Sequence, residues 1–98
     1  KIVGLNVSGL LFSDIDISNK KFYGCTFTNC TFNNISSSNV VLRMCIFDFA
    51  IFNDCSFIKS NSLFTSFSGA TFTHTLFTSS DIIQSNFNGI KAVTALAK

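Results

Sequence analysis

The feature that most constrains this chain is an apolar repeat with a period of five residues that never changes phase. From Ile2 to Ala97, every fifth residue is apolar in 18 of 20 cases, and these central positions hold 11 of the 13 Phe. The residue two places before each central position is small or apolar at every repeat except Lys20. A short, fixed period is typical of solenoids, in which each coil stacks on the next.

The odd length of the repeat predicts a bend in every unit. Inward and outward positions alternate within a unit, as in a β-strand. A straight strand would send Phe27 and Phe32 to opposite faces of a sheet, so both reach one core only if the chain turns between them. Residues that tolerate such turns recur two places after the central position: Gly4, Gly9, Asn19, Gly24, Asn29, Asn34, Asn39, Gly69 and Gly89. We therefore predict an all-β solenoid, since the spacing near 3.6 residues of an amphipathic helix is absent.

Several units resemble the pentapeptide-repeat family. They are "CTFTN" and "CTFNN" (residues 25–34), "CSFIK" (55–59) and "ATFTH" (70–74), and the resemblance extends over about residues 5–90. It implies a right-handed, four-sided parallel β-helix with four repeats per coil, hence about five coils here. In that register two Phe ladders would form, one from Phe12, Phe32, Phe52 and Phe72 and one from Phe27, Phe47, Phe67 and Phe87. The apolar columns alone also permit three sides.

The C-terminal end changes character, which divides the chain into residues 1–89 and 90–98. The first part is the predicted β-helix. The second is rich in Ala, Leu and Lys, which favour helix. We predict that it forms a short helix, with Val93 and Leu96 against the last Phe layer, that caps the solenoid or links it to a following domain. The chain starts in mid-repeat without Met, so we expect it to be part of a longer protein.

Three residues break the repeat. Ser37 and Ser62 stand at central positions, where a small polar residue leaves a void and a hydroxyl to satisfy. Two alternatives are open: the serine stays inward beside a void, or local distortion turns a neighbour such as Leu63 or Phe64 inward. Lys20 takes a small inward position, and because a buried lysine is unfavourable, residues 19–21 are expected to bulge outward.

All four cysteines occupy the small inward position, which predicts free thiols that pack like small hydrophobes: Cys25, Cys30, Cys45 and Cys55. Their spacing does not bring them to one point as a zinc site requires, so we expect no metal and no cofactor. Cys25 and Cys45 would lie on neighbouring coils, a distance compatible with a disulfide. A reducing, intracellular environment is the simpler interpretation.

The polar residues suggest no enzyme within these residues. Asp54 and the only histidine, His74, would stack at one corner, and we interpret them as a surface polar ladder with no nucleophile beside it. The net charge is +2 and no basic stripe alternates with aromatic residues, so nucleic-acid binding is not expected. No apolar run approaches the 18 residues of a membrane span.

The outward positions predict a protein-binding surface. In a four-sided register Tyr23, Arg43, Leu63 and Ile83 form one outward column. Met44 and Phe64 lie at the next corner, and Val41 is on the same side. Displayed apolar side chains of this kind indicate that a protein partner, or a neighbouring domain of the same protein, covers them.

Phe-rich, Ser- and Asn-rich irregular repeats with free cysteines also resemble the β-helix regions of effectors that enteric bacteria inject into host cells. One such group is similar to HECT-type E3 ubiquitin ligases, which implies a partner- or substrate-binding role in the host cytoplasm and ligase chemistry elsewhere in the protein. The alternative implied by the repeat family is a DNA mimic that acts on DNA gyrase. A mimic needs a strongly negative surface, whereas this chain has five Asp, no Glu and a positive net charge.

Overall fold

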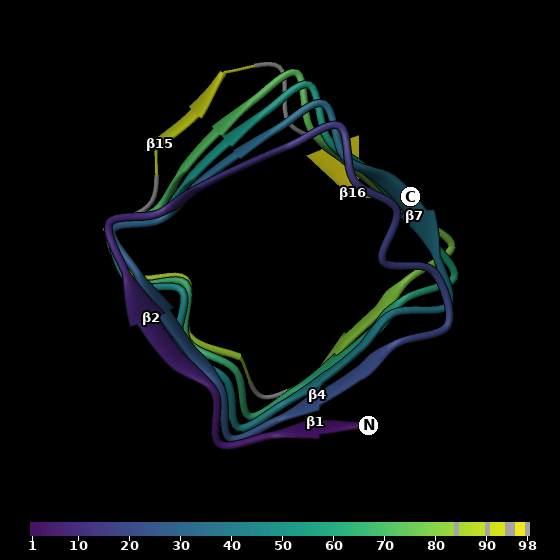
Figure 1. Ribbon diagram of the computed structural model, residues 1–98. Coiled ribbons are helices and arrows are strands. Elements are labelled where there is room, and N and C mark those ends of the chain that lie inside the picture. Colours follow the sequence, from purple (N-terminus) through teal and green to yellow (C-terminus); the bar gives the residue numbers. More distant parts are fainter. Residues whose placement is uncertain (84, 90, 94–95, 98) are drawn as a thin grey trace.

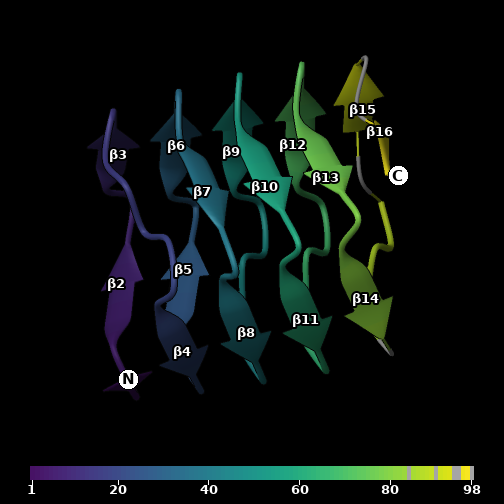
Figure 2. The same ribbon diagram turned by 90° about the vertical axis from the view of Figure 1, so that its right-hand side faces the viewer.

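In the computed structural model the chain winds as a right-handed, four-sided parallel β-solenoid with a square cross-section (Figure 1). The structure describes residues 1–83, 85–89, 91–93 and 96–97. One turn takes 20 residues, since Ile2 pairs with Phe22 and Phe22 with Leu42. The chain makes four complete turns and part of a fifth, and the turns lie side by side along the axis (Figure 2). The predicted fold class and its four sides are confirmed.

Each side of the square is a column of parallel strands, numbered here as faces 1 to 4 in chain order. Face 1 contains β1 (Ile2–Val3), β4 (Lys21–Tyr23), β8 (Val41–Arg43), β11 (Asn61–Leu63) and β14 (Asp81–Ile83). Face 2 begins with β2 (Asn6–Ser8) and β5 (Thr26–Thr28) and continues as single bridges at Ile46, Ser66 and Asn86. Face 3 contains β3 (Leu11–Ser13), β6 (Thr31–Asn33), β9 (Ile51–Asn53), β12 (Thr71–Thr73) and β15 (Lys91–Val93). Face 4 contains β7 (Ser36–Ser38), β10 (Ser56–Ile58), β13 (Leu76–Thr78) and β16 (Leu96–Ala97).

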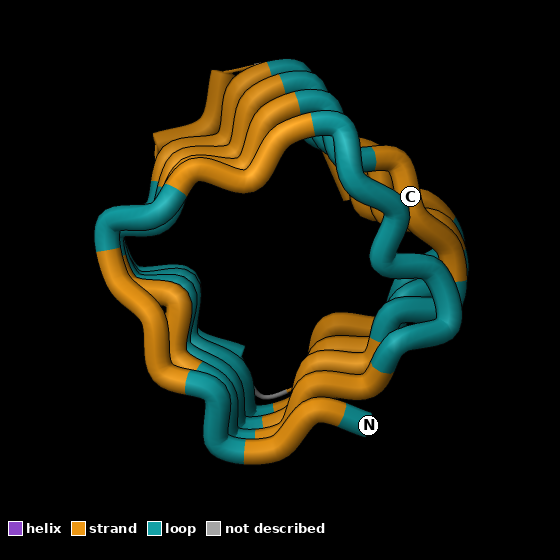
Figure 3. The backbone as a smooth tube through the Cα atoms, in the orientation of Figure 1, coloured by secondary structure: helices purple, strands orange, loops and turns teal. Residues whose placement is uncertain are grey.

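The corners fall where the sequence predicts them. Every fifth residue from Gly4 to Ser79, and Gly89, has a left-handed backbone with φ between 49° and 69°. Figure 3 shows these turns as the loop segments that join the four sides. Gly and Asn occupy many corners because they adopt this conformation at little cost. Bulkier residues also stand there, including Met44, Phe49 and Phe64.

Stacked Phe rings fill the core in two ladders, as expected. On face 3, the ring centroids of Phe12 and Phe32 are 5.3 Å apart, those of Phe32 and Phe52 4.8 Å, and those of Phe52 and Phe72 5.0 Å. A matching ladder on face 2 joins Phe27, Phe47, Phe67 and Phe87 at 5.0–5.2 Å. Burial of each such ring contributes about 1.5–3 kcal/mol before the cost of ordering the chain. The ladders therefore fix the register of the coils.

The small inward position carries a second ladder, of thiols and hydroxyls. All four cysteines are free and buried. The Cys45 thiol donates to the carbonyl oxygen of Phe22 at 3.3 Å, and Cys55 donates in the same way to Phe32. The Thr75 hydroxyl occupies an equivalent place and donates to the carbonyl of Phe52 at 3.2 Å. These side chains are small enough for the corner and also satisfy carbonyls of the preceding turn, which confirms a packing role for the cysteines.

The two serines at central positions stay inward. Ser37 and Ser62 both face the core and are buried. The Ser37 hydroxyl accepts from the backbone N–H of Ile17 at 3.0 Å, which satisfies it without any rearrangement. Leu63 stays half-exposed on face 1 and Phe64 is exposed at the corner, so of the two alternatives the inward rotation does not occur. Pairing of β11 with β8 and β14 holds the register, and a void remains at Ser62 instead.

The first turn is irregular where Lys20 predicts it. Residues 15–20 form no strand, although face 4 has strands in the later turns. The N–H of Lys20 donates to the carbonyl of Ile17 at 3.2 Å and closes a turn there. The Asp16 carboxylate accepts from the N–H of Ser18 at 2.9 Å. Lys20 itself is exposed, as expected.

The C-terminal helix predicted for residues 90–98 is wrong in the described part of that segment. Residues 91–93 form β15, which pairs with β12, and residues 96–97 form β16, which pairs with β13. The weak helix preference of Ala, Leu and Lys is overridden because the exposed strand edge of the preceding turn is a template for a further parallel strand. The expected packing of Val93 and Leu96 concerns side chains outside the described residues.

Candidate protein-binding surface

The outward side of face 1 brings the predicted column together. Strand pairing places Tyr23 beside Arg43, Arg43 beside Leu63, and Leu63 beside Ile83. The guanidinium carbon of Arg43 lies 5.8 Å from the centroid of the Tyr23 ring, within cation–π range. Val41 belongs to the second outward row of the same face and is half-buried. The side chain of Ile83 lies outside the described residues.

Met44 and Phe64 form the corner between faces 1 and 2 on consecutive turns. The N–H of Met44 donates to the carbonyl of Leu63 at 3.0 Å, which holds the two turns together there. Met44 is 62% exposed and Phe64 56% exposed. Both have a left-handed backbone, with φ of 53° and 52°. A left-handed conformation costs a residue with a side chain about 1–2 kcal/mol. These two large apolar residues therefore carry a conformational cost that burial of their side chains does not offset.

Sequence reasoning missed further apolar side chains on the same turn. Phe49 is 60% exposed at the corner between faces 2 and 3, and Ile46 and Ile51 are exposed on either side of it. The ring of Phe49 lies against the next turn, since a Cβ added to Gly69 would be only 2.6 Å from its Cε1 atom. One signal was available: Phe49 and Phe64 are the two Phe that do not fall on central positions.

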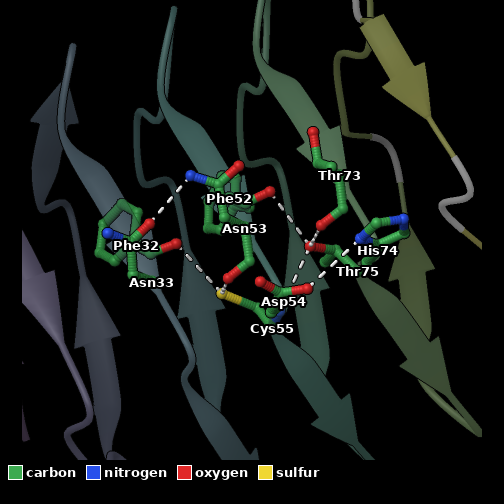
Figure 4. A network of polar contacts seen from close by, with 9 residues as sticks. All are labelled: Phe32, Asn33, Phe52, Asn53, Asp54, Cys55, Thr73, His74 and Thr75. Carbon is green, nitrogen blue, oxygen red and sulfur yellow. Dashed lines mark hydrogen bonds and ion pairs between the residues drawn. The ribbon is translucent and has the colours of Figure 1, made fainter.

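The polar ladder at the corner between faces 3 and 4 shows no catalytic geometry (Figure 4). The Nδ1 atom of His74 is 3.4 Å from an Asp54 carboxylate oxygen, and both side chains are exposed. The Asn53 amide on the preceding face donates to Asn33 at 2.9 Å. The nearby Cys55 thiol points inward, is buried and donates to the carbonyls of Phe32 and Asn53. It is therefore not accessible to act as a nucleophile beside His74.

Burial also makes the thiols poor nucleophiles and poor metal ligands. It raises the pKa of the Cys45 and Cys55 thiols above their ordinary value, because the thiolate would lose its hydration. Within residues 1–83, 85–89, 91–93 and 96–97, no three His, Cys, Asp or Glu side chains gather where they could hold a metal ion. The same part of the chain contains no helix long and apolar enough to cross a membrane.

Two hollows lie on the solenoid axis. A cavity of about 40 Å³ borders Ser62, between Leu42 and the rings of Phe47 and Phe67. A wider hollow of about 220 Å³ opens at the first turn, where Leu5 and Ile15 line its edge. Both are lined almost entirely by apolar surface and contain no convergent polar groups, so neither has the composition of a small-molecule site.

Comparisons with known proteins agree with this geometry. The family described as "Pentapeptide repeats (8 copies)" matches residues 21–59. Two trypsin-treated variants of QnrB1, described as a plasmid-mediated fluoroquinolone resistance protein, have a similar fold. The first is 17% identical with a TM-score of 0.68 and is matched over 96% of this chain and 65% of its own. The second is 18% identical with a TM-score of 0.70, over 91% and 56%. This chain therefore spans less than two thirds of either, and no curated protein sequence matches it significantly.

Proposed function

We propose that the chain is a member of the pentapeptide-repeat family and a non-catalytic scaffold that binds a protein partner. The partner-binding surface consists of the outward side of face 1 and its corner with face 2. Its residues are those that the sequence predicts: Tyr23, Val41, Arg43, Met44, Leu63, Phe64 and Ile83.

One observation carries this proposal: the exposure of Met44 and Phe64 in left-handed corners. Asn stands at equivalent corners elsewhere in the chain and relieves both the conformational cost and the exposure of apolar surface. Retaining Met and Phe here is therefore unfavourable for the isolated solenoid. A protein that covers them offsets this cost, and Met and aromatic residues are enriched at such interfaces.

The test is to exchange these two side chains for the residue that the corner prefers. We expect the double variant Met44→Asn, Phe64→Asn to fold with an unchanged far-UV circular dichroism spectrum and to lose partners that the wild-type chain captures from bacterial and eukaryotic cell lysates. The matched control is Phe49→Asn, the same change at the next corner, which should keep them. Capture that survives the double variant would place the binding surface elsewhere.

We also propose that the scaffold is the partner- or substrate-binding part of a larger bacterial effector related to HECT-type E3 ubiquitin ligases, delivered into the reducing host cytoplasm. Its support is the resemblance of the irregular, Phe-rich repeats and the four free, buried cysteines. An alternative occupant of the surface is a neighbouring domain of that larger protein. The sequence of the complete protein tests this: without a downstream catalytic cysteine domain, the ligase assignment falls.

A second candidate function is DNA mimicry directed at DNA gyrase. The likeness in fold to a fluoroquinolone resistance protein favours it. The net charge of +2 and the absence of Glu count against it, because a mimic must reproduce the negative charge of phosphates. The direct test is a gyrase supercoiling assay with a fluoroquinolone. Dose-dependent protection of supercoiling by the purified chain would rank this function first.

A further inference from the structure

The charged side chains of the described residues are distributed unevenly around the square. Among the residues whose side chains the structure describes, the positive ones border face 1, either on its outward rows or beside its corner with face 4: Lys1, Lys20, Lys21, Arg43 and Lys59. Asp14 and Asp54 lie at the corner between faces 3 and 4. That corner is diagonally opposite the one that displays Met44 and Phe64 (Figure 3). Among these described side chains, the partner-binding surface is therefore on the positive side.

The remaining carboxylates of the described residues do not neutralise this side. The Asp48 carboxylate, on face 2, accepts hydrogen bonds from the Ser66 hydroxyl and from the N–H of Ser68. Hydrogen bonds from the hydroxyl and then the N–H of Ser18, with a smaller contribution from Lys20, lower the pKa of Asp16. Asp81 belongs to face 1 but stands in β14 on the fifth turn, four turns from Lys1 in the same row. Across the described part of the chain, the only ion pair joins Asp54 to His74.

The cations on face 1 are held in place by an aromatic ring. The Lys1 ammonium nitrogen lies 4.6 Å from the centroid of Tyr23, and the Arg43 guanidinium approaches the same ring from the next turn. Cation–π contacts orient both groups without neutralising them. The guanidinium fork keeps its N–H donors for a carboxylate, with which it pairs in two parallel hydrogen bonds. Met44 and Phe64 provide an apolar contact directly beside this group.

We infer that the partner of this surface is an acidic protein segment with an apolar anchor residue. Its carboxylates pair with Arg43, Lys21 and Lys1, and its apolar side chain covers Met44 and Phe64. The inference rests on the proposed function and adds to it the chemistry of the partner. Charge complementarity of this kind speeds association and selects among partners, so binding should weaken steeply as salt is raised.

Three fluorescent probes test this chemistry against the wild-type chain at low salt. The first is a 12-residue peptide of alternating Glu and Ser with one central Phe, the second replaces each Glu by Gln, and the third is a single-stranded 12-nucleotide oligo-dT. We expect the acidic peptide to bind at least about tenfold more tightly than the neutral one. Equal binding of both peptides overturns the inference. Tighter binding of the oligonucleotide than of the acidic peptide also overturns it, in favour of nucleic acid.

Matched variants locate the binding. The double variant Lys21→Gln, Arg43→Gln should weaken binding of the acidic peptide about tenfold, and Phe64→Asn several-fold. Asp54→Asn changes the net charge by one unit on the opposite corner and should leave binding unchanged within about twofold. Loss of binding only in the Asp54 variant, or no loss in the others, contradicts the assigned surface. Failure of the acidic probe while captured partners still depend on Met44 and Phe64 would overturn this inference and leave the proposed function standing.

Discussion

Filling the cavity beside Ser62 should stabilise the solenoid. Ser62 is buried at a central position, where all other repeats except that of Ser37 carry an apolar residue, and its hydroxyl makes a long contact of 3.5 Å with the Ser85 hydroxyl. The adjacent cavity of about 40 Å³ is bordered by Leu42, Phe47 and Phe67. An apolar space of this kind stays dry, so its lining lacks contacts on one side. We therefore predict that Ser62→Val raises the free energy of unfolding.

The cavity volume sets the expected size of the gain. Unfilled space in a core costs about 24 cal/mol per Å³, so a cavity of about 40 Å³ corresponds to about 1 kcal/mol. Burial of an additional methyl group adds about 0.8 kcal/mol, and valine is the better strand residue. Loss of the long hydroxyl contact subtracts up to about 1 kcal/mol. The net expectation is a gain of about 1 kcal/mol, which for a domain of this size raises Tm by about 4–8 °C.

Urea denaturation followed by circular dichroism measures this difference. Ser62→Ala is the matched control, because it removes the hydroxyl without filling the space. We expect the alanine variant to be slightly less stable than the wild type and the valine variant to be more stable than both. A valine variant less stable than the alanine variant would show that the space beside Leu42 does not accept a larger side chain at position 62.

The remaining predictions concern a corner and the thiols. Gly69→Ala should destabilise the chain by more than Gly24→Ala, because both glycines have left-handed backbones but only a Cβ at position 69 collides with the ring of Phe49. Thermal melts measure the two losses, which should become equal when Phe49→Ala is added to both variants. A difference in Tm that persists would exclude this collision as the cause. Burial raises the pKa of the Cys45 and Cys55 thiols in the folded state, so the unfolded chain ionises these thiols more readily. The two thiols therefore contribute their full stabilisation below the unfolded pKa of about 8.5, and this contribution is lost as pH rises through their higher pKa in the folded state. Under reducing conditions the double variant Cys45→Ala, Cys55→Ala should show a smaller loss of stability between pH 7.5 and 9.5, and an equal loss would contradict this explanation.

The solenoid could be predicted because its repeat is enforced collectively. A slip of one residue at Phe47 would turn every later Phe away from the core, so the phase of the apolar positions determines the register of all coils. Single exceptions do not change it. Ser62 therefore stays inward and leaves a cavity, although a local argument favours replacing it by Leu63 or Phe64.

The C-terminal strands could not be predicted from local preferences for a related reason. Helix propensity is worth a few tenths of a kcal/mol per residue for Ala, Leu and Lys, and the segment is too short for a stable isolated helix. The paired edges of β12 and β13 offer a complete set of backbone hydrogen bonds to β15 and β16. Long-range pairing of this kind is not visible in the composition of nine residues, although the period of five continues through Ala92 and Ala97.

The candidate surface could be predicted in part because its residues break the rule that the fold imposes on corners. Phe49 and Phe64 both leave the central phase and both take a left-handed conformation. Both are more than half exposed, and they differ in one contact: the ring of Phe49 lies over Gly69 on the next turn, which offsets part of its cost within the solenoid. Phe64 is 56% exposed at the corner between faces 1 and 2, one turn after Met44 and next to Leu63 of the predicted outward column. We propose that a partner covers Phe64, because its left-handed backbone and exposed ring are unfavourable for the isolated solenoid. Phe64→Asn should therefore weaken partner binding, whereas Phe49→Asn should leave it unchanged.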